Sequence, residues 1–264
     1  MKLILHESQE VNVARIIAVA NQKGGVGKTT TAVNLSSCLA VAEKKTLLVD
    51  IDPQANTTSG IGLDKTKMDT SVYEVLIGAR TLLEVIKPTD LSFLNVAPSS
   101  IALVGAEVEM VSMMSREKIL ARALATVADR YDYIIIDCPP SLGLLTVNAL
   151  SAAHSVIIPI QCEYYALEGL GQLLHTIQLV QNNLNPSLEI EGVLLTMYDG
   201  RLNLSRQVAD EARKFFNNRV YNTVISRNVR LSEAPSFGKP IILYDILSTG
   251  AENYMALTKE VLSR

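Results

Sequence analysis

Short apolar runs rich in branched residues recur along the chain, without the alternation of apolar and polar residues that marks a half-exposed strand. Uninterrupted runs of this kind are typical of strands that are covered on both faces, as in parallel sheets. They predict strands inside a buried sheet. The runs lie at residues 16–20, 46–49, 133–136, 156–160 and 192–196.

Helical periodicity fills the segments between these runs, with apolar residues recurring at spacings of three and four. Strands and helices that alternate with such connection lengths predict an α/β fold with a doubly wound, mainly parallel sheet. Residues 60–115 are the hardest to place. The helical stripes occupy residues 32–42, 119–128, 167–180 and 208–216.

Length and composition fit one large domain. Of the 264 residues, 48% are hydrophobic and 19% are charged, which is typical of a folded globular chain. No repeat or low-complexity linker divides the sequence, so we expect residues 15–264 to form a single domain and residues 1–14 an N-terminal tail or a lead-in to the first strand. No apolar run reaches the roughly 18 residues of a membrane-spanning helix, which favours a cytoplasmic protein.

The cysteines and histidines show no metal-ligand or catalytic pattern. The three cysteines are far apart and form no CxxC pair, so the sequence indicates neither a disulfide framework nor a zinc site. We expect them to be buried as small apolar side chains. The three histidines have no cysteine, histidine or carboxylate at ligand spacing, which favours structural or solvent-facing roles.

Charge is distributed unevenly along the chain. The sequence carries 24 lysines and arginines against 27 aspartates and glutamates, a net charge of −3. Residues 201–240 contain eight basic and three acidic residues, an excess of five positive charges that leaves −8 for the rest. Such asymmetry predicts a polyanion-binding face, although a solvated helix of mixed charge remains the alternative.

The strongest motif stands where the first apolar run meets the first helical stripe, at residues 21–30 with the sequence NQKGGVGKTT. Glycines let successive backbone N–H groups point at one phosphate, and the helix N-terminus adds its positive dipole end. In this interpretation Lys28 neutralises the β and γ phosphates of ATP, and the Thr29 hydroxyl binds Mg²⁺. Gln22 replaces the usual first glycine, and Lys23 is an additional lysine. The other nucleotide-binding positions are Gly24, Gly25, Val26, Gly27 and Thr30.

Three carboxylates follow predicted strands. Asp50 and Asp52 are two residues apart, so both leave the end of the second strand toward the phosphate loop. One can serve the hydrated Mg²⁺ shell while the other orients a water for in-line attack on the γ-phosphate. Asp137 ends an unbroken apolar run and fits a carboxylate that holds Mg²⁺ through water. The alternative for Asp50 and Asp52 is that they only stabilise the turn at the strand end.

These segments resemble the deviant Walker A ATPases, whose signature is Lys-Gly-Gly-x-Gly-Lys-Thr; residues 47–56 and 134–141 look like the two switch regions of that group. Residues 161–169, 195–199 and 227–236 narrow the resemblance to the ParA/Soj chromosome-partitioning ATPases. The resemblance runs from Arg15 onward and implies a P-loop NTPase fold. It also implies ATP and Mg²⁺ as cofactors, and an ATP-dependent homodimer.

The resemblance also implies roles for individual residues. Asp52 would orient the attacking water, and Asp50 would support the hydrated Mg²⁺ shell without binding the metal directly. Lys23 would cross the dimer interface to the partner's nucleotide and contribute to catalysis, although an ordinary surface lysine is the alternative. Gly24 would lie where two phosphate loops approach closely. Met197 and Pro235 would surround adenine, although both could equally be core residues.

The function implied by the resemblance is slow, partner-stimulated hydrolysis of ATP to ADP and phosphate, which drives chromosome or plasmid partitioning. The partners would be a ParB-type centromere-binding protein and nonspecific double-stranded DNA, and the protein would be cytoplasmic and nucleoid-associated. Arg201 and Arg230 match arginines that the family uses for DNA, and Arg227 is a weaker third candidate. Long guanidinium side chains in loop-like positions suit backbone phosphates.

Two other classes remain open. A membrane-cycling ATPase of the MinD type, which positions the division site, shares both switch regions but ends in a basic amphipathic helix. Residues 252–264 contain only Lys259 and Arg264 as basic residues, and their apolar positions look like a helix packed on its own domain, with no membrane contact. A metabolic enzyme, such as a phosphotransferase or an iron–sulfur reductase, could use the same loop, although no acceptor site or second cysteine motif accompanies it.

Overall fold

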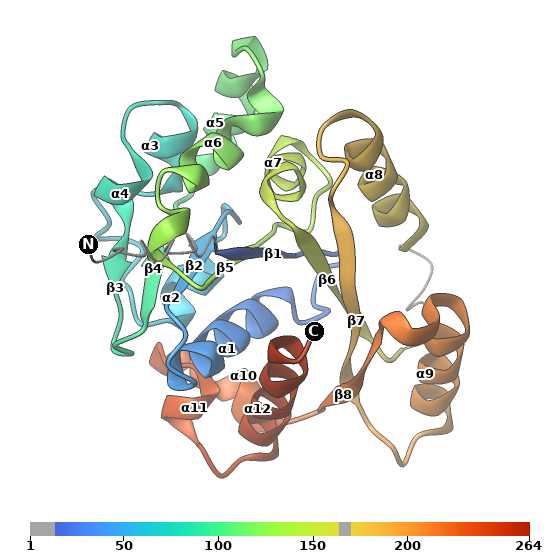
Figure 1. Cartoon of the computed structure of the whole chain (residues 1–264). Helices are drawn as coiled ribbons and strands as arrows, with labels where there is room; N and C mark the ends of the chain where they lie inside the picture. Colours follow the sequence, from blue (N-terminus) through green and yellow to red (C-terminus); the bar gives the residue numbers. More distant parts are fainter. Residues whose placement is uncertain (1–13, 164–169) are drawn as a thin grey trace, which may run out of the picture.

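The computed structural model describes residues 14–163 and 170–264. Within them the strands form one eight-stranded sheet (Figure 1). Neighbouring strands are parallel except at one edge, where the two-residue β3 runs antiparallel to β4. In spatial order the strands are β3 (Lys87–Pro88), β4 (Leu94–Ala97), β2 (Thr46–Asp50), β5 (Tyr133–Asp137), β1 (Arg15–Val19), β6 (Ser155–Gln161), β7 (Glu189–Tyr198) and β8 (Val220–Ser226).

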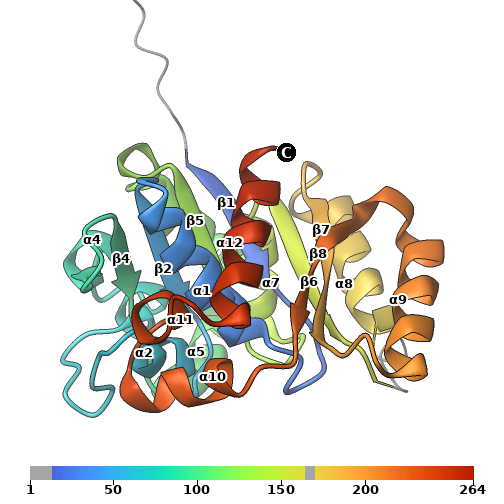
Figure 2. The same ribbon diagram turned by 90° about the horizontal axis from the view of Figure 1, so that it is seen from below.

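Helices cover both faces of the sheet and bury a separate core on each side (Figures 1 and 2). Successive residues of β1 divide between them: Ile16 and Ala18 enter one core, and Ile17 and Val19 enter the other. The first face is covered by α3 (Val72–Leu76), α4 (Leu82–Val85), α5 (Leu103–Glu109), α6 (Ile119–Ala125), α7 (Leu144–Ala152), α8 (Leu170–Asn183) and α9 (Asn203–Phe216). The second is covered by α1 (Lys28–Val41), α10 (Val229–Glu233), α11 (Ile241–Tyr244) and α12 (Thr249–Leu262).

The predicted fold is confirmed: the sheet is doubly wound and mainly parallel, and all five predicted strands lie in its interior. The stripe at 119–128 forms α6 and a 3-10 turn, and the stripe at 208–216 lies within α9. Residues 167–169 of the third stripe lie outside the described residues. The expected tail does too, apart from Ala14, and the division into tail and single domain stays a prediction.

The carboxyl ends of the parallel strands meet at one edge of the sheet, where ligands of doubly wound folds bind. The register pairs Asp137 at the end of β5 with Val19 of β1 on one side and with Asp50 of β2 on the other. Figure 2 shows α2 (Asn56–Gly60), α5 and α10 at this same edge. The phosphate loop and the predicted carboxylates therefore converge here.

Candidate nucleotide-binding site

The loop between β1 and α1 is held in a tight conformation that needs glycine. Gly25 and Gly27 have φ angles of +75° and +88°, in the left-handed region that residues with a Cβ rarely adopt. Gly27 is the N-cap of α1. Val26 between them is buried, and its carbonyl accepts a hydrogen bond from the Thr196 hydroxyl at 2.9 Å. This contact anchors the loop to β7.

The two lysines of the loop have different surroundings. Lys28 is only 7% exposed, and its Nζ donates to the carbonyl oxygen of Lys23 at 3.0 Å. Burial lowers the pKa of Lys28, and the nearby carboxylates of Asp137 and Asp52 oppose that shift. Lys23 is half-buried, and no described carboxylate lies within ion-pairing distance of its ammonium group. Lys28 therefore faces the carboxylate cluster, and Lys23 does not.

Asp137 has a buried carboxylate with one oxygen left free. Its Oδ2 accepts hydrogen bonds from the hydroxyls of Thr29 at 2.8 Å and Thr57 at 2.7 Å. Its Oδ1 is buried and has no hydrogen-bond partner among the described residues. Burial raises the pKa of Asp137 above its usual range. A buried, unpartnered carboxylate oxygen beside a threonine hydroxyl fits a hard cation such as Mg²⁺, which prefers oxygen ligands.

Asp50 lies beside Asp137 on the neighbouring strand, and its carboxylate accepts hydrogen bonds from nearby residues of the chain. Its side chain is fully buried and accepts from the Thr58 amide at 2.9 Å, the Thr58 hydroxyl at 2.7 Å and the Asp52 amide at 3.1 Å. Burial first, and then the facing carboxylate of Asp137, raise the pKa of Asp50. This position, one strand away from Asp137, fits a residue that supports the metal shell without binding the metal.

Asp52 has an oxygen available to a ligand. Its side chain is 7% exposed, and Oδ1 accepts from the Gln54 amide at 2.9 Å. The Asp52 carbonyl accepts from the Ser99 hydroxyl at 2.6 Å, which fixes the backbone. Oδ2 makes no hydrogen bond with any described residue. Asp52 also raises the pKa of Asp137 through its charge, so the two carboxylates are close.

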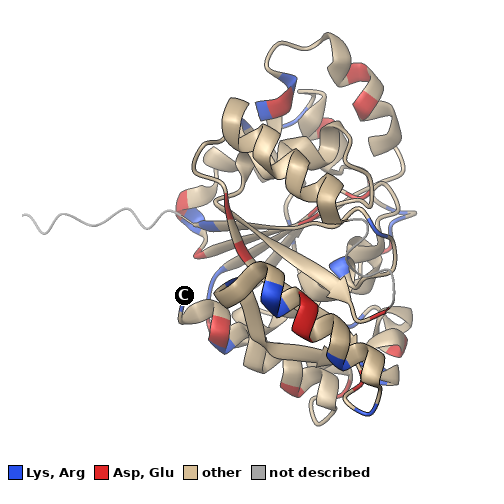
Figure 3. Ribbon diagram, turned by 90° about the vertical axis from the view of Figure 1, so that its right-hand side faces the viewer, with Lys and Arg blue, Asp and Glu red and all other residues tan. Residues whose placement is uncertain are grey.

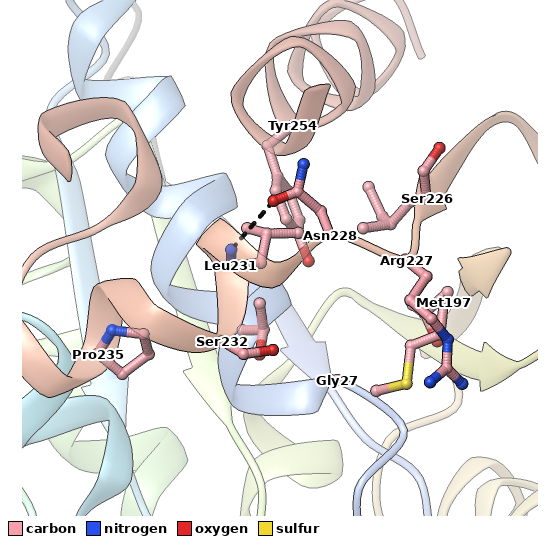
Figure 4. Close-up of a pocket in the computed structure, with 12 residues that line it drawn as sticks. Gly27, Met197, Ser226, Arg227, Asn228, Leu231, Ser232, Pro235 and Tyr254 are labelled. Carbon is pink, nitrogen blue, oxygen red and sulfur yellow. Dashed lines mark hydrogen bonds between the residues drawn. The ribbon is translucent and has the colours of Figure 1, made fainter. Parts of the chain in front are cut away.

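A cavity of about 330 Å³ adjoins the phosphate loop (Figure 4). Figure 4 shows Met197 and Pro235 on opposite sides of it, and Gly27 of the loop contributes to the wall. The structure therefore brings both predicted adenine residues to one cavity beside the phosphate loop. A flat purine fits between an apolar sulfur and a rigid proline ring.

Two residues of this wall had no role in the sequence prediction. Tyr254 of α12 is 1% exposed, and its hydroxyl lies 3.2 Å from that of Thr31 on α1. In the sequence, Tyr254 is an aromatic residue among the apolar positions of residues 252–264, and those positions predicted only a helix packed on its own domain. Asn228 lines the cavity and caps α10 by accepting from the Arg230 amide at 2.8 Å. It belongs to the 227–236 segment, so its proximity was foreseeable.

Each candidate DNA-binding arginine has a carboxylate partner. Arg201, whose side chain is 89% exposed, forms a two-pronged pair with Asp199, with Nη2–Oδ2 at 2.6 Å and Nε–Oδ1 at 2.9 Å. These hydrogen bonds lower the pKa of Asp199 to about 2. Arg230 pairs with Glu233 at 2.9 Å and with Asp245 at 3.5 Å.

Arg227 differs from the other two because it lines the cavity beside Met197, and it pairs with Glu163 at 3.4 Å. Its position suits a nucleotide contact as well as DNA. Figure 3 shows acidic residues interspersed with basic ones on the side of the molecule that carries α8 and α9. The part of the positive segment that lies in α9 therefore carries charges of both signs.

The predicted burial of the cysteines is confirmed for Cys38, Cys138 and Cys162. His154 has a structural role, because its Nδ1 accepts from the Ile16 amide at 2.9 Å. His6 lies outside the described residues, as does the 164–169 part of a family-like segment. None of the helices among the described residues is both long and apolar enough to cross a membrane.

A doubly wound parallel sheet, a glycine-rich loop at its first strand-to-helix turn and aspartates at the ends of β2 and β5 define the chain as a P-loop NTPase. A family profile described as an AAA domain matches residues 14–190. The sporulation initiation inhibitor protein Soj of Bacillus subtilis (strain 168) is 61% identical over 249 residues, which are 94% of this chain and 98% of Soj.

The chromosome partitioning protein ParA of Myxococcus xanthus (strain DK1622) is 58% identical over 252 residues, or 96% of this chain and 89% of that protein. The crystal structure of a Mycobacterium smegmatis protein named cobyrinic acid a,c-diamide synthase, with a bound ATP analog and magnesium, has a TM-score of 0.84 and 40% identity, with 95% of each chain covered. The chain belongs to the ParA/Soj family of chromosome-partitioning ATPases. The predicted family and ATPase class are thus confirmed.

Proposed function

We propose that the protein is an ATP-dependent dimerising switch that binds DNA nonspecifically in its ATP state and hydrolyses ATP to partition a chromosome or plasmid. The observation that carries this proposal is the carboxylate cluster beside the phosphate loop. Asp137 Oδ1 is free among the described residues, next to Thr29 and within the field of Lys28. This arrangement suits the phosphates of a nucleotide and a divalent cation.

Nucleotide binding would use the loop and the adjoining cavity. The backbone of residues 23–30 would cradle the phosphates, and Lys28 would leave the Lys23 carbonyl to contact them. Mg²⁺ would be held by Thr29 and, through water, by Asp137, and when bound it would neutralise phosphate charge. Met197 and Pro235 would hold adenine. The M. smegmatis protein, which is 40% identical, binds an ATP analog and magnesium.

Hydrolysis would depend on residues at two positions. Asp52 would orient the attacking water through Oδ2, which is free among the described residues. Lys23 would reach the nucleotide of a second subunit, because its ammonium group does not join the carboxylate cluster of its own subunit. Gly24 is exposed, so two loops could approach each other there. An ATP-bound homodimer would then be the hydrolytic form.

DNA contacts would come from Arg201 and Arg230, with Arg227 as a third candidate. Their side chains are 89%, 55% and 64% exposed, and exposed ion pairs are worth little, so the carboxylate partners can give way to phosphates. Backbone contacts of this kind would make binding independent of sequence. DNA binding would also place the protein on the nucleoid. A ParB-type protein would stimulate hydrolysis, in keeping with the partitioning role of the M. xanthus relative.

The test compares gel filtration and DNA retention with ATP, with ADP and without nucleotide. We expect a dimer that retains nonspecific DNA only with ATP. A protein that stays monomeric and unretained in all three states would contradict the proposal.

The alternatives have separate tests. A MinD-type protein would sediment with liposomes in the presence of ATP. The last helix argues against this, because Tyr254, Leu257 and Val261 are buried against the protein itself. A metabolic role is favoured by the name of the M. smegmatis structure, but 40% identity there is outweighed by 61% and 58% to Soj and ParA. Amide formation that requires ATP would support the metabolic role.

A further inference from the structure

Ser99 is a completely buried polar residue in the connection between β4 and α5. Its hydroxyl donates to the Asp52 carbonyl at 2.6 Å, across 47 residues of sequence. Its amide donates to the Thr58 hydroxyl oxygen at 2.8 Å. Burying a polar group is unfavourable unless it is hydrogen-bonded. Here both donors of Ser99 are used on the segment that follows β2, so Ser99 ties that segment to the end of β4.

Asp52 begins a turn whose backbone is strained. The Ala55 amide donates to the Asp52 carbonyl at 2.9 Å and closes the turn that leads into α2. Ala55 has a φ angle of +53°, in the left-handed region that a residue with a Cβ rarely adopts. Such a conformation persists only where the surrounding structure holds it in place. The turn that carries Asp52 therefore depends on contacts from its surroundings.

Ser99 supplies the contact that comes from another part of the sheet. The other hydrogen bonds of Asp52 are local: its amide donates to the Asp50 carboxylate, and it accepts from the amides of Gln54 and Ala55. Within residues 14–163 and 170–264, Ser99 is the only residue outside 50–58 that hydrogen-bonds to Asp52. Local bonds set the shape of the turn, whereas the bond from Ser99 opposes its movement away from β4.

The residues around Ser99 fix its own position. The Pro98 carbonyl accepts from the Val72 amide at 2.8 Å, which anchors the end of β4 to the start of α3. Thr58, which accepts from the Ser99 amide, donates its hydroxyl hydrogen to Asp50 at 2.7 Å. Buried networks whose members are all satisfied are rigid. Ser99 is therefore a fixed point against which Asp52 is held.

We propose that Ser99 is a positioning residue for ATP hydrolysis, whose hydroxyl holds the Asp52 backbone so that the free Oδ2 meets the attacking water. The proposal rests on the role proposed above for Asp52 and specifies what places that carboxylate. A displacement of about 1 Å in a reacting group can cost roughly a hundredfold in rate. The effect of Ser99 acts through Asp52, so it belongs to the chemical step and leaves ATP binding unchanged.

The test uses the full chain with Ser99→Ala, which removes the hydroxyl and keeps the backbone. The matched control is Ser100→Ala, the neighbouring serine, whose hydroxyl pairs with that of Ser71 at 2.9 Å and makes no hydrogen bond to residues 50–58. A second variant, Ser99→Cys, fills the buried position with a thiol, which is a weak donor. Phosphate release gives kcat and KM, a fluorescent ATP analogue gives the affinity, and gel filtration with ATP gives the dimer.

We expect Ser99→Ala to lower kcat at least about tenfold, with KM and ATP affinity within about twofold of the unmodified chain. The ATP-bound dimer should accumulate, as expected for Asp52→Ala, whereas a merely destabilised protein would not accumulate it. Ser99→Cys should turn over at a rate between those of Ser99→Ala and the unmodified chain. Ser100→Ala should show normal kcat and KM.

Combining Ser99→Ala with Asp52→Ala tests whether Ser99 acts through Asp52. If it does, single-turnover hydrolysis by the double variant should match that of Asp52→Ala alone within about twofold. A loss that multiplies with that of Asp52→Ala would overturn the proposal, and so would a lower melting temperature with unchanged kcat in Ser99→Ala. Normal kcat in Ser99→Ala beside slow Asp52→Ala would overturn it and leave the proposed function intact. Normal turnover of Asp52→Ala would instead contradict the role of Asp52 itself.

Discussion

Lys28 and Lys23 lie five residues apart in one loop, yet only the first is placed among the carboxylates. Lys28→Ala should abolish tight ATP binding because it removes the buried cation that would face the phosphates. Loss of a charged hydrogen bond costs about 2–3 kcal/mol, or roughly 30- to 150-fold in affinity. Since burial already lowers the pKa of Lys28, removing this desolvated charge should leave thermal stability nearly unchanged. Titration with a fluorescent ATP analogue would measure the effect, with Lys45→Ala, an exposed lysine at the other end of β2, as control.

Lys23→Ala should have the opposite profile. Its backbone contacts, the amide to Asn21 and the carbonyl to Lys28, do not depend on the side chain, so ATP binding should persist. Dimerisation and hydrolysis should fall, because the ammonium group would serve the other subunit's nucleotide. Light scattering with ATP and a phosphate-release assay measure the two effects. Normal turnover and a normal dimer would make Lys23 an ordinary surface lysine.

Asp52 allows binding to be separated from chemistry. Asp52→Ala leaves the Asp137 carboxylate and its hydrogen bond from the Thr29 hydroxyl in place. It removes only the free Oδ2 acceptor and the hydrogen bond from the Gln54 amide. We expect ATP affinity within a few-fold of normal, hydrolysis reduced at least about a hundredfold, and accumulation of the ATP-bound dimer. Single-turnover hydrolysis and gel filtration measure these quantities. Turnover close to that of the unmodified chain would assign the water to another group.

At the scale of elements, the phosphate loop combines two glycines whose left-handed backbone disfavours any other residue with one glycine whose backbone does not. Gly25 and Gly27 need positive φ, whereas a Cβ at Gly24 would meet no atom within 4 Å in one subunit. Gly24→Val should therefore fold and bind ATP normally, yet fail to dimerise, because in the proposed dimer two loops would approach each other there. Analytical ultracentrifugation with ATP would detect the loss. Gly25→Ala is the contrasting variant, in which backbone strain should weaken ATP binding itself.

Which elements were predictable follows from their surroundings. The five predicted strands lie in the interior of the sheet and are covered on both faces, so they appear as uninterrupted apolar runs. The strands β8 and β4 were not predicted. β8 lies at the edge, and exposed Asn222 interrupts its apolar pattern; β4 has only four residues.

Thr57 is a residue of the site that the sequence could not predict. It bonds to Asp137 across 80 residues of sequence, and this contact depends on how α2 packs, which no local pattern encodes.

The site residues at strand ends and in the phosphate loop were predictable, because parallel strands place their carboxyl ends at one edge of the sheet. The residues that form the cavity wall were harder to predict. Tyr254 comes from the last helix and reaches the nucleotide side only because α12 packs on α1, which its own sequence does not specify.

At the scale of the whole molecule, a protein of net charge −3 needs a local concentration of positive charge to bind DNA. The three candidate arginines lie near the carboxyl edge of the sheet, but each is paired with a carboxylate. One subunit would therefore offer few phosphate contacts. A two-fold dimer would place both sets along one duplex, so tight binding should require ATP.

Arg230→Ala, alone and combined with Arg201→Ala, is the decisive change for DNA binding. Both side chains are exposed, and their ion-pair partners are Asp199, Glu233 and Asp245, outside the carboxylate cluster, so ATP binding and dimerisation should persist. DNA affinity should fall, and the slope of log affinity against log salt should shrink by about 0.9 for each phosphate that the variant no longer neutralises. Asp199→Asn should act in the opposite direction, because it removes the carboxylate that pairs with Arg201 and neutralises its charge. Filter retention of nonspecific duplex at several salt concentrations measures all of these, with exposed Arg130→Ala, at the amino end of β5, as the matched control. Unchanged retention and slope in the double variant would move the DNA surface away from these two arginines.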